Sequence, residues 1–185
     1  MECGREWANL SAIPVDATSG SDVTGRPNPT AFAFPSTHQY RCVMIPAFSP
    51  ETGYLPPGEH PATWQEIVER FGKTQWRGKL LDGLKVALAS LRAAGCKKVY
   101  LDGSFVTAKE RPGDFDACWE AAGVDGDLLD KELLEFVNGR ATQKAKYGGE
   151  LFPAEWIVGE TGTPFRAFFQ QDQDGNPKGI IAIDL

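Results

Sequence analysis

One stretch of the sequence, Val99 to Trp119 (VYLDGSFVTAKERPGDFDACW), constrains the fold most, because it joins two strand-like runs through a bend of small residues. Its Gly103-Ser104 pair follows a short apolar run, and Asp114 and Asp116 lie beyond a nine-residue gap. Side chains alternate between the faces of a strand, so both aspartates would point the same way. Two carboxylates on one face are typical of a divalent-metal site, and small residues at the bend let main-chain N–H groups approach a polyphosphate.

An ordinary turn is the alternative interpretation of these residues. Pro112-Gly113-Asp114 has the composition of a turn, in which Asp114 would cap a neighbouring N–H group and Asp116 would only be solvated. Asp102, which precedes the glycine, is interpreted as a turn or helix-cap residue, although its carboxylate would also suit a metal.

The order of apolar strand, Gly-Ser, spacer and Asp-apolar-Asp-apolar resembles the signature of the polymerase-beta-like nucleotidyltransferase superfamily. The strings LPPGEHPATW, LDGSFVTAKERPGDFD, GGELF and FFQQDQDGNPKGI, within Leu55 to Leu185, are also similar to a branch of small uncharacterised bacterial proteins assigned to that superfamily. The resemblance implies that Gly103 and Ser104 hold the phosphates of a nucleoside triphosphate. It also implies that Asp114 and Asp116 bind magnesium, with a third carboxylate on a later strand.

The same resemblance gives a candidate for the third carboxylate. GGELF falls where the family has it, so Glu150 takes this role as a catalytic and metal-binding residue, although the family more often has Asp there. Glu155 is the reserve candidate. It lies five positions on, and therefore on the opposite face of a regular strand.

Basic residues near these positions are candidates for binding the nucleotide. Lys109 lies within reach of a phosphate, and Arg140, Lys144 and Lys146 occupy a stretch that can continue helically with nearly one face in common. They would steer a nucleotide or a polyanionic acceptor. A simple solvated basic face is the alternative.

Helix and strand signals divide the rest of the chain. A capping box at Thr63 begins a short helix that Gly72 ends. Leucines at helical spacing predict a long helix from Thr74 to Ala94, with Gly95 as its left-handed cap. The remaining predictions are strands over 97–101, 115–119, 150–158 and 180–185, a helix over 125–138 and a helix that begins at Pro164.

Two segments near the C-terminus have a structural and a functional interpretation. The phenylalanines of the last predicted helix, Phe165, Phe168 and Phe169, are interpreted as core residues rather than as a base-stacking platform. DQDGN at 172–176 is interpreted as a turn, because its glycine is in the wrong register for a calcium loop.

The alternation of strands and helices predicts an α/β (α+β) fold: a small mixed β-sheet of about four or five strands with helices packed on one face, nucleotidyltransferase-like. Residues 1–46 have no sustained period and are rich in Gly, Ser, Thr and Pro, so they are predicted to form a flexible N-terminal arm. Residues 47–185 are predicted to form a single domain, because a chain of 185 residues with 42% hydrophobic content suits one domain with a sizeable core plus tails.

Composition excludes several classes of protein. A net charge of -6 argues against a protein that coats long DNA or RNA. No apolar run approaches the length of a membrane span, and the N-terminus lacks the features of a secretory signal, so we expect a cytoplasmic protein. The four cysteines are widely spread and are expected to be buried reduced thiols, and the two histidines, His38 and His60, do not have metal-ligand spacing.

These features predict a minimal nucleotidyltransferase. It would transfer a nucleoside monophosphate from a nucleoside triphosphate to an unknown hydroxyl acceptor by two-metal catalysis with Mg²⁺ or Mn²⁺. The acceptor would be a small molecule, a protein side chain or an RNA end. The acceptor pocket would come from the N-terminal arm, from the predicted helix that contains Trp64, or from a second chain, which by analogy with toxin-antitoxin modules would be a partner protein. The alternative is a catalytically weak or inactive fold that senses nucleotides or binds a partner.

Overall fold

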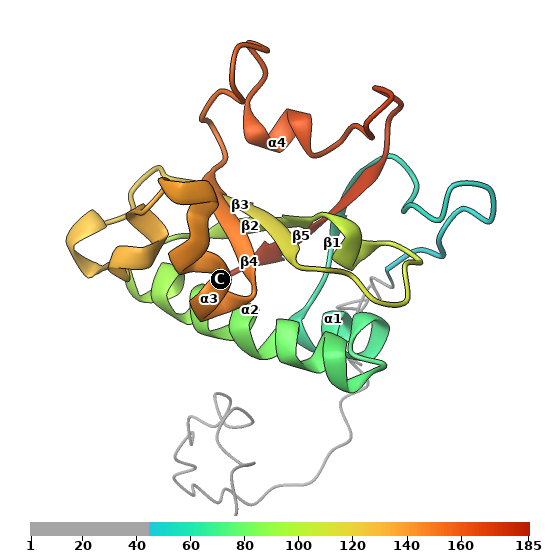
Figure 1. The fold of residues 1–185 in the computed structure, drawn as a ribbon, viewed down its shortest axis with the longest axis horizontal. Helices are drawn as coiled ribbons and strands as arrows, with labels where there is room; N and C mark the ends of the chain where they lie inside the picture. The colour runs from blue at the N-terminus through green and yellow to red at the C-terminus, as the bar shows by residue number, and fades with distance from the viewer. Residues whose placement is uncertain (1–44) are drawn as a thin grey trace, which may run out of the picture. The chain divides into compact units, whose positions relative to one another are not determined.

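The computed structural model describes residues 45–185, so the arm predicted for 1–46 lies almost entirely outside the described residues. The strands and helices, in chain order, are β1 (Gly58–Pro61), α1 (Trp64–Phe71), α2 (Gln75–Ala93), β2 (Lys98–Asp102), β3 (Phe115–Trp119), α3 (Ala141–Tyr147), β4 (Gly149–Pro153), α4 (Phe165–Phe168) and β5 (Gly179–Asp184) (Figure 1). Four short 3-10 turns lie between them: η1 (Ser104–Val106), η2 (Gly126–Leu128), η3 (Lys131–Leu134) and η4 (Asn138–Arg140).

The strands form one mixed sheet in the order β1-β5-β2-β3-β4. Strand β2 is antiparallel to both of its neighbours, β5 and β3, whereas β1 pairs with β5 and β3 pairs with β4 in parallel. The segment that contains α3 provides the crossover that a parallel pair such as β3 and β4 requires. The predicted α/β class and the mixed sheet of about four or five strands are confirmed.

Helices α1 and α2 cover one face of the sheet, and α4 lies on the other (Figure 1). Leu84 and Leu91 of α2 are fully buried and share a core with Val99 and Leu101 of β2. Tyr147 of α3 belongs to the same core, whereas the ring of Phe169, which follows α4, packs in a second, smaller core on the opposite face. The predicted one-sided helix layer therefore holds for α1 to α3.

Local sequence signals fixed the first two helices as predicted. Thr63 forms the capping box with Glu66 at the start of α1, and Gly72 caps its end. Thr74 accepts a hydrogen bond from the backbone of Arg77 at the start of α2, and Gly95 follows its end with a φ of +93°. At that φ a residue with a side chain would be strained, which explains the glycine.

The helix predicted over 125–138 is wrong, because this segment contains only short 3-10 turns. The Asp125 carboxylate accepts a hydrogen bond from the nearby Asp127 N–H group, and the Asp130 N–H group donates to Ser90 Oγ on α2. These bonds give the backbone an alternative to a helical ladder. The apolar residues that were expected to form one buried stripe are not all buried. Leu133 is buried, whereas Leu128 and Val137 are 60% and 69% exposed.

Smaller differences concern the C-terminal third. The strand predicted over 150–158 ends at Pro153, after which Ala154 donates back to Trp119 O and the chain turns. Helix α4 has only four residues, and Phe168 is 42% exposed rather than buried with its neighbours. The predicted turn at 172–176 is confirmed, because the Asp172 carboxylate accepts hydrogen bonds from the main-chain N–H groups of this segment.

Cys96 and Cys118 are buried free thiols, as predicted, while Cys3, Cys42 and His38 lie outside the described residues. None of the helices in residues 45–185 has the length and apolar character that crossing a membrane requires.

Candidate functional site

Three carboxylates lie side by side on the sheet face that α1 and α2 leave uncovered. Asp102 pairs in register with Asp116 across β2 and β3, and Asp116 pairs with Glu150 across β3 and β4. Residues directly opposite one another in neighbouring strands share a face. We call Asp102, Asp116 and Glu150 the carboxylate row. Phe115 and Ala117 point into the core beneath, so the predicted alternation along this strand is confirmed.

Gly103 is required by the carboxylate row itself. Its φ is +79°, and a Cβ atom at this position would lie 2.2 Å from Oδ2 of Asp116. We expected backbone to approach a phosphate at this bend, and the group that approaches Gly103 in the structure is the Asp116 carboxylate. Ser104 follows as the first residue of η1.

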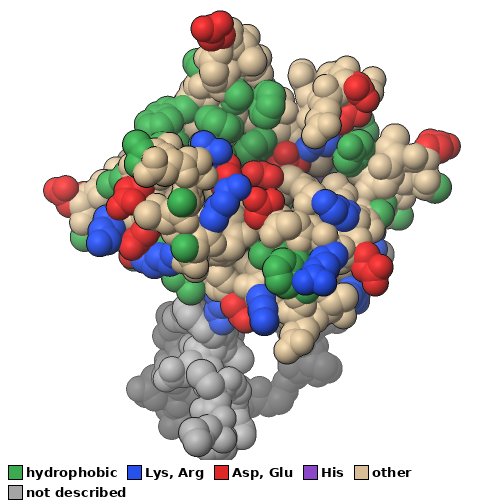
Figure 2. All heavy atoms as spheres, in the orientation of Figure 1, with side chains coloured by type: hydrophobic (Ala, Val, Ile, Leu, Met, Phe, Trp, Pro, Cys, Tyr) green, Lys and Arg blue, Asp and Glu red, His purple; other side chains and the backbone are tan. Residues whose placement is uncertain are grey.

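Two basic side chains from the segment before β4 bind Glu150 of the row and Asp114 beside it. Lys144 Nζ lies 2.6 Å from Glu150 Oε1 and 3.2 Å from Asp114 Oδ2, and Arg140 Nε lies 2.7 Å from Glu150 Oε2. Acidic and basic side chains are visible in contact near the centre of one face of the molecule (Figure 2). These ion pairs raise the pKa of Lys144. One oxygen of Asp114 and one oxygen of Glu150 therefore lie close to the same position, which the ammonium group of Lys144 occupies.

Asp116, between these groups, has neither an ion pair nor a hydrogen bond to its carboxylate within residues 45–185. Burial, together with the negative charges of Asp114, Asp102 and Glu150, raises the pKa of Asp116 to about 7, although Lys144 opposes this shift. A half-buried carboxyl among three others is the electrostatic arrangement that a bound cation would relieve.

Asp102 forms a buried ion pair with Lys178, which precedes β5. Burial raises the pKa of Asp102, and Lys178 opposes this shift. The interpretation of Asp102 as a turn or helix-cap residue is wrong, because Asp102 is the last residue of β2 and the cap position of η1 is Gly103, where no side chain forms a capping hydrogen bond. The pair joins residues far apart in the chain, and the string PKGI was the only sequence signal for Lys178.

A cavity of about 600 Å³ opens beside the carboxylate row. It is lined by four of the predicted site residues, Gly103, Ser104, Lys109 and Asp116, and by both members of the buried ion pair. The remaining walls are 52–54, 107–108, Phe168 and 171–173. The other three predicted residues, Asp114, Lys144 and Glu150, do not line this cavity. Lys144 therefore binds carboxylates in this structure, whereas Lys109 is placed toward the cavity.

A residue that the sequence analysis did not identify shapes one wall of this cavity. The buried guanidinium of Arg77 donates to the main-chain oxygens of Phe105 and Lys109 over 2.8 and 2.6 Å, and to that of Thr107 over 3.2 Å. Arg77 belongs to α2, so the long helix fixes the loop that follows Gly103. No short-range sequence signal marks such a contact, because its partners lie about 30 residues away.

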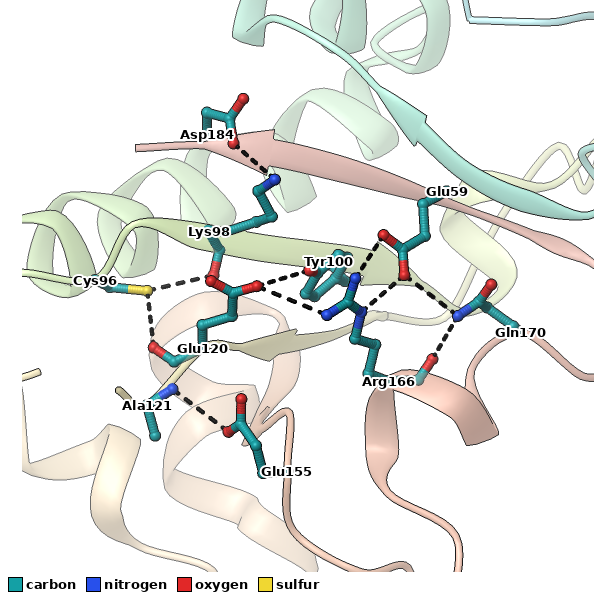
Figure 3. A network of polar contacts seen from close by, with 10 residues as sticks. All are labelled: Glu59, Cys96, Lys98, Tyr100, Glu120, Ala121, Glu155, Arg166, Gln170 and Asp184. Carbon is teal, nitrogen blue, oxygen red and sulfur yellow. Dashed lines mark hydrogen bonds and ion pairs between the residues drawn. The ribbon is translucent and has the colours of Figure 1, made fainter. Parts of the chain in front are cut away.

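Glu155, the reserve candidate, lies apart from the carboxylate row. Its carboxylate is 3.5 Å from the N–H group of Ala121, in the polar network of Figure 3. The centre of this network is Arg166, which binds Glu59 with distances of 2.7 and 2.9 Å and stacks 4.4 Å from the Tyr100 ring. The network joins the segment around α4 to the sheet, and Glu150 is the candidate that neighbours Asp116.

The donor set fits a hard divalent cation by its chemistry, since such ions prefer carboxylate oxygens. In the conformation described for residues 45–185, no group of three Asp, Glu, His or Cys side chains is close enough together to hold a metal ion. The Lys144 ammonium group lies between Asp114 and Glu150 and pairs with one oxygen of each. Asp114, Asp116 and Glu150 are the residues that would hold a metal after Lys144 withdraws.

Comparison with known proteins gives one family. A family model described as a family of unknown function (DUF6932) matches residues 46–184. No curated protein and no solved structure matches the chain.

Proposed function

The chain belongs to the DUF6932 family of unknown function, and from its site we propose that it is a minimal nucleotidyltransferase. It would transfer a nucleoside monophosphate from a nucleoside triphosphate to a hydroxyl group. The observation that carries this proposal is the placement of Asp116 and Glu150 on adjacent strands, next to a cavity that Gly103 and Ser104 line. This reaction needs no histidine or cysteine nucleophile.

Bound Mg²⁺ or Mn²⁺ would lower the pKa of the acceptor hydroxyl and stabilise charge on the phosphates. Asp114, Asp116 and Glu150 would hold it. Their oxygens supply the negative charge, and Lys144 would be free to leave Glu150 once another cation neutralises that carboxylate. Lys144 would then be available to a phosphate oxygen.

The cavity supplies the groups that suit a triphosphate. Lys109 lines it with positive charge, Lys178 lines it within its ion pair with Asp102, and Ser104, the first residue of η1, provides a hydroxyl donor. In the reaction, an acceptor oxygen bonds to the α-phosphorus while the bond from that phosphorus to the bridging oxygen breaks. The hydroxyl proton passes to a carboxylate of the row, and pyrophosphate leaves on the side of the cavity.

A second candidate function is nucleotide sensing or partner binding without turnover. The ion pairs of Lys144 and Arg140 favour it, because they neutralise Glu150 without a metal. The occurrence of Glu rather than Asp at position 150 favours it as well. The two candidates differ in whether a covalent product forms.

The test uses nucleoside triphosphates labelled at either the α- or the γ-phosphate, incubated with the protein, Mg²⁺ or Mn²⁺ and cell extract. The proposal expects a macromolecular or small-molecule product that carries the α-label and lacks the γ-label. Asp114→Asn and Asp116→Asn should abolish it, and Glu155→Gln, outside the carboxylate row, should retain it. Nucleotide binding without any labelled product would favour the sensing function. If the protein neither binds a nucleotide nor forms a labelled product, both the transferase and the nucleotide-sensing function are refuted.

A further inference from the structure

An aromatic surface borders the carboxylate row on the side away from the cavity. Its rings are Phe136, Phe152, Trp156 and Phe165, which we call the aromatic shelf. Phe136 lies 4.7 Å from Trp156 and 6.4 Å from Phe152, and Phe152 stacks on Phe165 at 4.0 Å. Phe152 is buried, so the inner part of the shelf is fixed by the second core.

The outer part of the shelf is exposed. Trp156 is 49% exposed, and the apolar residues beside it in the chain and beside Phe136 are also exposed, Ile157 at 50% and Val137 at 69%. Figure 2 shows hydrophobic side chains gathered next to the charged group at the centre of this face. Single exposed apolar residues need no explanation, but a contiguous aromatic group beside a polar site is characteristic of a ligand surface.

Arg140 connects the shelf to the carboxylate row. Its guanidinium lies 5.0 Å from the centre of the Phe152 ring, and its Nε atom binds Glu150. Phe152 is two residues after Glu150 in β4, so both side chains are on the same face of the sheet. A ligand on the shelf would therefore contact the row at Glu150.

The direction of the proposed reaction indicates whether the shelf would bind the nucleotide or the acceptor. In an in-line displacement the attacking oxygen and the leaving oxygen lie on opposite sides of the phosphorus. The cavity with Gly103, Ser104 and Lys178 lies on one side of Asp116, and Glu150 with the shelf lies on the other. If pyrophosphate leaves toward the cavity, the acceptor approaches from the shelf.

We propose that the aromatic shelf binds the acceptor, and that the acceptor is a small molecule that carries its hydroxyl next to a flat aromatic or heteroaromatic ring. This inference rests on the proposed function for the direction of transfer. The ring would lie against Trp156 and Phe136, and the hydroxyl would point past Arg140 to Glu150. A polyanionic acceptor fits less well, because the chain has a net charge of -6 and the row adds negative charge at the point of attack.

The test separates ring binding from catalysis. Adenosine and N-acetyltyrosinamide are ring-bearing probes from two sources, and ribose and N-acetylserinamide are their ring-free counterparts. Binding is measured by saturation-transfer NMR without nucleotide, and transfer is measured with α-labelled nucleoside triphosphate. The variants are Trp156→Ala on the shelf and Val137→Ser next to Phe136 in the chain, with Val86→Ala on α2, as exposed as Trp156, as the control.

We expect at least one ring-bearing probe to bind, its ring-free counterpart not to bind, and Trp156→Ala to weaken binding about tenfold, the effect of losing one stacked ring. Asp114→Asn should leave this binding unchanged, so that a failed transfer reaction does not conceal it. Equal binding of ribose and adenosine, or unchanged binding in both Trp156→Ala and Val137→Ser, would overturn the inference even if transfer occurs. A concentration-dependent dimer that Trp156→Ala disrupts would overturn it too, since a second copy would then cover the shelf.

Discussion

The ionised Asp116 carboxylate lowers the stability of the folded protein when no cation is bound. Its pKa is raised to about 7 by burial and by neighbouring carboxylates, so the folded state holds this proton more tightly than the unfolded state does. The stabilisation from the bound proton is present at acidic pH and is lost as the pH rises through about 7. At pH 8 the folded protein therefore carries an unfavourable charge.

We predict that Asp116→Asn, in the presence of a chelator, increases the free energy of unfolding at pH 8 by about 1–2 kcal/mol more than it does at pH 5. Urea denaturation at the two pH values measures this. Glu155→Gln, which removes an exposed carboxylate outside the row, should change stability by less than about 0.5 kcal/mol at either pH. An equal gain at both pH values would show that the effect is not electrostatic.

The buried pair of Asp102 and Lys178 leads to a second prediction about single residues. Their side chains are 8% and 11% exposed, so Lys178→Met would leave a buried carboxylate without its cation and should cost about 3 kcal/mol of stability. The double variant Asp102→Asn with Lys178→Met removes both charges and should recover most of that loss. Denaturation curves that show the double variant as unstable as the single one would contradict this account.

A site residue can be predicted from the sequence when the pattern that identifies it lies in neighbouring residues. Asp116 and its orientation followed from alternation along one short strand, and the neighbouring position of Glu150 followed from a family resemblance. The contacts of Asp102 with Lys178 and of Arg77 with the loop after Gly103 had no such signal, because each joins distant parts of the chain. The role of Lys144 was also only partly predicted, since the sequence could not show that carboxylates would bind it.

The elements show the same dependence on local signals. Thr63 and Thr74 begin α1 and α2 as predicted, because a cap needs only its own neighbours. The segment 125–138 has helical caps and apolar residues as well, but Ser90 of α2 binds its backbone and part of its apolar stripe faces solvent. Tertiary contacts decided its conformation, and these are absent from a local pattern.

The packing of α2 against α3 is testable through two glycines of the same helix. A Cβ atom at Gly83 would lie 1.8 Å from the main-chain oxygen of Tyr147, whereas one at Gly78 would meet nothing within 4 Å. We predict that Gly83→Ala destabilises the protein by about 2 kcal/mol because α3 must move. Gly78→Ala should stabilise it by about 0.5–1 kcal/mol through helix propensity.

Thermal unfolding of the two variants measures this difference, and similar behaviour of both would exclude a close contact between α2 and α3. Because α3 carries Lys144, its displacement should also weaken the ion pairs with Asp114 and Glu150. Gly83→Ala thus tests whether the helix layer positions a side chain of the site.

At the scale of the whole molecule, the larger hydrophobic core and the candidate site lie on opposite faces of the sheet. One face is covered by helices and holds the larger core, and the other carries the carboxylate row, with the cavity on one side and the aromatic shelf on the other. The sheet architecture was predictable from alternating elements. Which face α1 to α3 would cover was not, because that depends on where the crossover segments pack.

This separation predicts how a divalent cation affects the folded protein. An ion that binds only the folded state stabilises it, by about 2.7 kcal/mol at a concentration 100 times its dissociation constant. Binding at the row should also remove the repulsion around Asp116. We therefore predict that Mn²⁺ raises the melting temperature of the wild-type protein by several degrees, and that the increase is larger at pH 8 than at pH 5, where protons compete for Asp116.

The double variant Asp114→Asn with Asp116→Asn should show no increase with Mn²⁺, although it should be the more stable protein in chelator. Lys144→Gln is the matching test, because it removes the ammonium group that competes with the metal ion for Asp114 and Glu150. Mn²⁺ should stabilise this variant at a lower concentration than it stabilises the wild type. An equal effect of Mn²⁺ on all three proteins would place the ion elsewhere, and Asp114, Asp116 and Glu150 would then not form a metal site.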